Sequence, residues 1–187
     1  MNRIFLSIIC IVLMPLASMA QSIVGNWKTQ FEMPNQGSPA TLIVTLYLDN
    51  DNSLNANCEL KMEIDALQQG TPEGLMQLGF ATNTNGTWKR DDKKLTFNLN
   101  CDNLEVNCTE IMMPNLDVET ANALVEKFMP NINSLKIILV EQFNQFNGML
   151  CNTFTISKLT DDELALDDET GQSQLFTRAD VGEYDPE

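Results

Sequence analysis

The chain contains no histidine, and it has few basic and few aromatic residues. The missing imidazole excludes a Ser-His-Asp triad and the common Cys-His pair, which are two of the main routes to a nucleophilic enzyme. No Cys-x-x-Cys motif is present either, so the cysteine spacing does not favour a structural zinc site. We therefore expect a protein that is not an enzyme and that holds no metal ion and no cofactor.

Positive charge is scarce as well. The 26 Asp and Glu residues against 11 Lys and Arg residues give a net charge of −15, and the last residues, 181–187, form an acidic tail. Such a charge repels phosphate backbones and anionic lipid surfaces, so we expect no binding to nucleic acid. After residue 20 no apolar run reaches the ~18 residues of a membrane span, and we expect no stable membrane insertion.

The first 20 residues have the layout of a secretory signal peptide. Arg3 is followed by an apolar run to Leu13 and then by small residues that end at Ala20. An uncleaved anchor is the alternative, but the apolar run is shorter than a span requires. We expect cleavage after Ala20 and a location in the periplasm or outside the cell. Residues 21–187 then suit one domain.

Strict alternation of apolar and polar residues dominates the first half of the chain. Residues 41–48 and 54–65 both alternate in this way, and the polar run DNDNS joins them, which predicts a hairpin of two half-buried strands. Residues 78–101 predict a second hairpin, and residues 104–111 a further strand. Three short strands are indicated between residues 151 and 178.

One segment interrupts the strands, at residues 117–147. Asp117 can cap a helix, apolar residues follow at helical spacing, and Gly148 can stop it. Because proline breaks helices, Pro130 predicts two helical pieces. The alternative makes residues 135–143 a strand that pairs with the next one across Asn147-Gly148.

Hairpin-linked strands with one apolar face must bury that face and protect their edges. An antiparallel up-and-down β-barrel of about 8 to 10 strands does both. A β-sandwich is the alternative, but it needs long crossovers that the early strands do not show. The expected class is mostly β, a barrel with a helical insertion.

The run Gly25-Asn26-Trp27 on the first strand and Arg178 in LFTRAD give the chain a family resemblance. It resembles the bacterial secreted lipocalin-like domains of the calycin superfamily, and residues 156–180 look like their last three strands. The resemblance implies that Arg178 packs over Trp27 by cation–π attraction and hydrogen bonds to backbone carbonyls. The lipocalin Thr-Asp-Tyr motif is absent, so the resemblance reaches only the wider superfamily.

The resemblance implies a small apolar ligand inside the barrel. The alternative is an interaction or inhibitor-like module with a packed barrel, whose protein partner binds the loops or the helical insertion. Inward-facing residues of the predicted strands are the candidate lining of a ligand site. They are Leu46, Cys58, Leu60, Met62, Phe97 and Leu99.

Two acidic patterns have simpler explanations than chemistry. Residues 161–163 and 167–169 could supply a glycosidase carboxylate pair, but both lie at predicted hairpin turns, where acidic residues are common. Residues 49–53 imitate the start of an EF-hand loop, yet Leu54 and Leu60 stand where that loop needs glycine and glutamate. We interpret all three of these runs of residues as polar turns.

Four cysteines follow residue 20, at positions 58, 101, 108 and 151. In an exported protein they allow two disulfides in any of three pairings. Cys58 and Cys101 each share a strand face with apolar residues, so a buried thiol is the other reading. A bond between Cys108 and Cys151 would pin both ends of the helical insertion, and it is the pairing we favour here.

Overall fold

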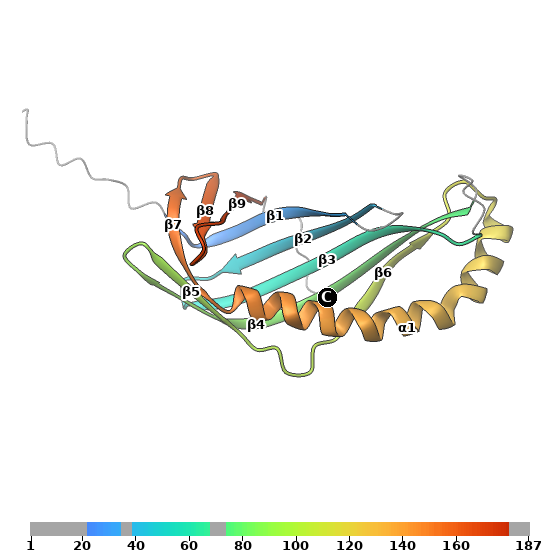
Figure 1. Ribbon diagram of the computed structural model, residues 1–187, viewed down its shortest axis with the longest axis horizontal. Coiled ribbons are helices and arrows are strands. Elements are labelled where there is room, and N and C mark those ends of the chain that lie inside the picture. The colour runs from blue at the N-terminus through green and yellow to red at the C-terminus, as the bar shows by residue number, and fades with distance from the viewer. Residues whose placement is uncertain (1–21, 35–38, 68–73, 180–187) are drawn as a thin grey trace, which may run out of the picture.

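The computed structural model describes residues 22–34, 39–67 and 74–179. These residues form a mostly antiparallel β structure with one long helix (Figure 1), which confirms the expected class. The strands are β1 (Gly25–Pro34), β2 (Pro39–Leu48), β3 (Ser53–Asp65), β4 (Leu75–Asp91), β5 (Lys94–Leu99), β6 (Asn107–Met112), β7 (Thr153–Leu159), β8 (Glu163–Asp167) and β9 (Ser173–Arg178). The helix α1 spans Val118–Leu150, between β6 and β7.

Eight of the strands close into a barrel. Their order is β3-β2-β1-β9-β8-β7-β5-β4, and β4 pairs again with β3 to complete the circle. β6 is the ninth strand and joins the sheet only through β4. The closing seam between β1 and β9 is short, since it pairs Trp27 with Arg178 and Lys28 with Thr177.

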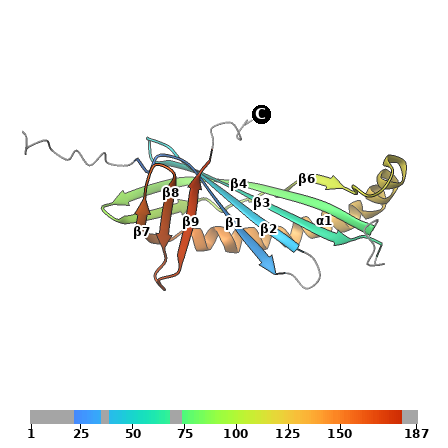
Figure 2. The same cartoon turned by 90° about the horizontal axis from the view of Figure 1, so that it is seen from above.

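The barrel is splayed at one end because β4 divides one of its edges between two neighbours. Residues 86–91 of β4 pair with β5, whereas residues 77–81 pair with β6. The long strands β1 to β4 therefore extend well beyond the short strands β7 to β9 (Figure 2). α1 runs along this extended part of the sheet in both views.

The predicted alternation is confirmed along the long strands. Every second residue of β2 from Ala40 to Leu48 is buried, and the same holds in β3 from Leu54 to Leu60. The intervening residues are polar or only half-buried, as a sheet with one covered face requires. These inner faces form one continuous core with the helix.

The helix differs from the prediction, because Pro130 does not divide it. α1 is continuous over 33 residues, with Asp117 at its N-cap and Cys151 at its C-cap, so it also passes Gly148. Figure 1 shows that its first half curves, which is how a helix accommodates an internal proline. Pro130 is exposed, so its ring and the lost hydrogen bond face solvent. The alternative of a strand at residues 135–143 is wrong.

One face of α1 fills the barrel interior, and it carries a single fully buried polar residue. Ile132, Leu139, Phe143 and Leu150 are the buried apolar residues of that face. Asn147 is 0% exposed, and its Nδ2 donates to Thr84 Oγ1 of β4 at 2.8 Å. A buried amide without a partner would cost free energy, so this bond fixes how the helix seats on the sheet.

We predict that Thr84→Val lowers the free energy of unfolding by about 1–3 kcal/mol, because it leaves the Asn147 amide buried without its acceptor. The double variant Thr84→Val/Asn147→Leu removes both polar partners and should be less destabilised than Thr84→Val alone. Urea unfolding followed by circular dichroism measures these two variants and the single variant Asn147→Leu. A double variant that loses the sum of the two single losses would show that the bond does not couple the helix to β4.

Candidate functional site

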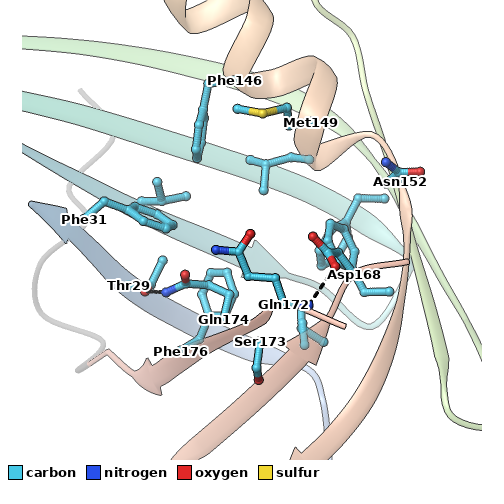
Figure 3. Close-up of a pocket in the computed structure, with 15 residues that line it drawn as sticks. Thr29, Phe31, Phe146, Met149, Asn152, Asp168, Gln172, Ser173, Gln174 and Phe176 are labelled. Carbon is cyan, nitrogen blue, oxygen red and sulfur yellow. Dashed lines mark hydrogen bonds between the residues drawn. The ribbon is translucent and has the colours of Figure 1, made fainter. Parts of the chain in front are cut away.

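A cavity of about 370 Å³ opens at the end of the barrel where α1 stops. Its walls come from β1, β2, β5 and β7 to β9 and from the last turns of the helix (Figure 3). Phe146 and Met149 reach into it from the helix, opposite Phe31 on β1. We call this space the barrel-mouth cavity.

Phenylalanine dominates the apolar wall. Five of the nine phenylalanines of the chain line the barrel-mouth cavity. Phe31 and Phe146 meet edge to face, with ring centroids 6.0 Å apart, and Phe97 and Phe154 are tilted at 5.8 Å. The fifth ring is Phe176 of β9, which is buried. Such walls offer flat faces and ring edges to an aromatic or aliphatic ligand.

Polar groups gather on the side formed by β1 and the β8–β9 turn. The amide of Gln174 donates to the hydroxyl of Thr29, and Ser173 and Gln172 lie beside it. Asp168 supplies the charge on this rim. Hydrogen bonds from the Thr170 side chain and from the backbone N–H of Gln172 lower the pKa of Asp168 below its ordinary value, so this carboxylate stays ionised at neutral pH.

A second, smaller cavity of about 230 Å³ adjoins the first along α1. It is lined mainly by apolar residues of β1, β2 and β3 and by the same helix, among them Leu42 and Leu139. Phe146 and Met149 line both cavities. These two side chains therefore form the partition between them.

The structure places only part of the predicted lining at these cavities. Phe97 lines the barrel-mouth cavity and Leu60 the second one. Met62 lies on a separate surface groove beside Lys61 and Glu63.

The other three predicted lining residues, Leu46, Cys58 and Leu99, are buried in the core and line neither of these two cavities. The helix is the reason. Cys58 Sγ lies 3.9 Å from Asn147 Oδ1, so helix side chains occupy the space that a ligand would need. Burial raises the pKa of Cys58 to about 12, as expected for a thiol enclosed in a core.

Most residues that line the barrel-mouth cavity were not predicted from the sequence, notably Thr29, Phe31, Phe146 and Phe154. Thr29 and Phe31 follow Trp27 at intervals of two, so the alternation of β1 could have placed them inside. Phe146 belongs to the helix, and no pattern in the sequence indicates which end of the barrel a helix covers.

Gly25, Trp27 and Arg178 meet where β1 and β9 close the barrel. The Trp27 ring is 0% exposed, and the Arg178 guanidinium lies over it, 4.3 Å from the centroid. Arg178 also donates to the backbone carbonyls of Ser22 and Val24 at 3.2 Å each and to that of Asp161. One side chain thus joins the start of β1, the end of β9 and the β7–β8 turn.

Gly25 makes this close approach possible. Its φ is +137°, a conformation that favours glycine, and a Cβ atom at this position would lie 2.1 Å from Arg178 Nη1.

The acidic runs lie at turns, as interpreted from the sequence. Residues 161–163 lie at the β7–β8 turn, where Glu163 pairs with Lys158, and residues 167–169 at the β8–β9 turn. Residues 49–53 form the β2–β3 turn, in which Ser53 donates to Asp49 and Asp51. Among the described residues, no group of three or more Cys, Asp and Glu side chains is arranged to hold a metal ion.

The favoured disulfide between Cys108 and Cys151 is not present: both are free thiols, as are Cys58 and Cys101. Cys108 lies on β6, where its Sγ contacts the Glu110 carbonyl, whereas Cys151 Sγ contacts the backbone of Leu99 at the end of β5. The two sulfurs therefore face different strands.

Over the ranges that the structure describes, no helix is long and apolar enough to cross a membrane.

We predict that Gly25→Ala lowers the free energy of unfolding by about 2–4 kcal/mol, because it adds backbone strain and displaces Arg178. Gly171→Ala is the matched control: its φ is +85°, but no atom lies within 4 Å of its added Cβ, so only the strain of about 1–2 kcal/mol applies. Urea unfolding of both variants measures the difference. Equal losses would mean that the Arg178 contact adds nothing to the closure.

No protein-family model matches the chain, and no curated protein matches it.

Proposed function

We propose that the protein is a lipocalin-like carrier, not an enzyme, that binds a small apolar molecule in the barrel-mouth cavity. The observation that carries the proposal is the cavity of about 370 Å³ among five phenylalanines. Its volume lies within the range of ligand sites, roughly 300–1,000 Å³. The signal-like residues 1–20 support a place of action outside the cytoplasm.

The contrast with the rest of the interior supports a binding site. Around Leu46 and Cys58 the same barrel is filled by side chains of α1, as a stable core requires. At the mouth the helix ends, and Leu150 is its last residue. The apolar walls there enclose a space that no side chain of the described residues fills, and a ligand of matching chemistry would fill it.

The rim restricts the polar end of the ligand. Asp168 places a negative charge at the mouth, and the chain as a whole has a net charge of −15. An anionic head group would be repelled, while a neutral or cationic one would be accepted. Gln172 and Gln174 offer amide groups for hydrogen bonds to that head. We propose a neutral or cationic amphiphile with an aromatic or aliphatic body.

The partition sets the length of ligand that fits. Phe146 is half-buried, and Met149 is 63% exposed. Rotation of these two side chains would join the second cavity to the first, so a longer apolar body could lie along α1. A short ligand would need only the barrel-mouth cavity.

We predict that the neutral fluorophore N-phenyl-1-naphthylamine binds saturably with one site per protein. Met149→Asp places a carboxylate in the partition and should weaken binding about tenfold, equivalent to ~1.4 kcal/mol. Ile137→Asp is the matched control, because Ile137 is a 75% exposed apolar residue of the same helix that does not line either cavity.

Fluorescence titration measures both variants, and circular dichroism verifies that they are folded. Equal weakening in the two variants, or no saturable binding by the wild type, would contradict the proposal. Native mass spectrometry of protein purified gently from its producing cells would then identify the natural ligand.

A second candidate function is suggested by the outer face of α1. Ile137 and Ile138 are neighbours in α1 that are 75% and 56% exposed, and adjoining exposed apolar residues can mark an interaction site. This face would suit a protein partner, a second copy of the chain included. Sedimentation of the wild type against the double variant Ile137→Asp/Ile138→Asp tests the second copy. Association that only the wild type shows would favour this function.

A further inference from the structure

Two thiols meet where the end of α1 lies against the end of β5. Cys101 follows β5 by two residues, and Cys151 is the C-cap of α1. Cys151 Sγ lies 3.2 Å from the backbone nitrogen of Leu99 and 3.7 Å from its carbonyl oxygen. Cys101 Sγ lies 3.9 Å from the same carbonyl oxygen.

Both sulfurs therefore lie beside one oxygen atom, the carbonyl oxygen of Leu99. Burial is the main cause that raises the pKa of Cys101, and the nearby Cys151 raises it further. Both residues are only partly buried, so a reagent in solution can reach them.

The other two thiols have different surroundings. Cys58 is buried on β3 beside Asn147, and Cys108 on β6 contacts the Glu110 carbonyl. Their described contacts include no other thiol.

We infer that Cys101 and Cys151 form a disulfide bond that ties the end of α1 to the end of β5. The oxidant is a disulfide donor, either a small molecule such as oxidised glutathione or a protein disulfide. The thiolate of one cysteine attacks the donor and releases one donor thiol, which leaves a mixed disulfide. The second cysteine then attacks that mixed disulfide.

Overall, the two protein thiols lose two hydrogens and two electrons pass to the donor, whose disulfide becomes two thiols. The S–S bond of the donor breaks, and one S–S bond forms in the protein.

The bond would brace the barrel-mouth cavity. Leu150 and Asn152 flank Cys151 and line that cavity, and Phe97 lines it from β5. The bond also closes a loop of about 50 residues that contains β6 and the whole helix, and loops of this length restrict the unfolded chain substantially.

The test is to incubate the reduced, folded chain with oxidised glutathione, block free thiols with N-ethylmaleimide and map the link by mass spectrometry without reduction. Cleavage before Asp102 separates Cys101 from Cys108. We expect a Cys101–Cys151 link that persists in Cys58→Ser and Cys108→Ser and is lost in Cys101→Ser and Cys151→Ser. A different link, or none, would overturn the inference.

Thermal unfolding provides an independent readout. Oxidation should raise the Tm of the wild type by roughly 5–15 °C. The double variant Cys101→Ser/Cys151→Ser should melt close to the reduced wild type and should not respond to the oxidant. A Tm of the wild type that oxidation leaves unchanged would overturn the inference.

Discussion

The structure depends on covering the apolar inner face of the long strands. β1 to β4 present alternating buried residues over lengths that the short strands β7 to β9 cannot cover. α1 covers the remainder with a single face of apolar residues at helical spacing. The helix is therefore part of the barrel core. The Asn147–Thr84 hydrogen bond gives the helix a defined position on the sheet within an otherwise apolar contact.

The candidate site is a consequence of where that helix stops. Upstream of Asn147 the helix side chains occupy the interior, and downstream of Leu150 the chain leaves it to begin β7. The phenylalanines of several strands converge on the vacated space. The proposed disulfide at Cys151 would form at this same point. The packing, the cavity and the proposed disulfide therefore all depend on the C-terminal end of α1.

The strands could be predicted from the sequence, because alternation records directly which side chains face inward, as Leu54 to Leu60 show. The continuity of the helix could not be predicted, because a proline inside a helical pattern indicates a break unless its exposure to solvent is known. The lining was missed for a related reason. Cys58 and Phe31 are both inward-facing residues, and only the position of α1 decides that one is packed and the other lines a cavity.

The pairing of β1 with β9 at Trp27 and Arg178 determines when the barrel can close during synthesis of the chain. Its two strands are far apart along the chain, because β1 begins at Gly25 and β9 ends at Arg178. A chain that leaves the ribosome with its N-terminus first presents β1 long before this partner exists. Until β9 has been made, one edge of β1 has no partner strand and is open to foreign strands. The nascent protein therefore exposes a bare strand edge for as long as β9 is still being made.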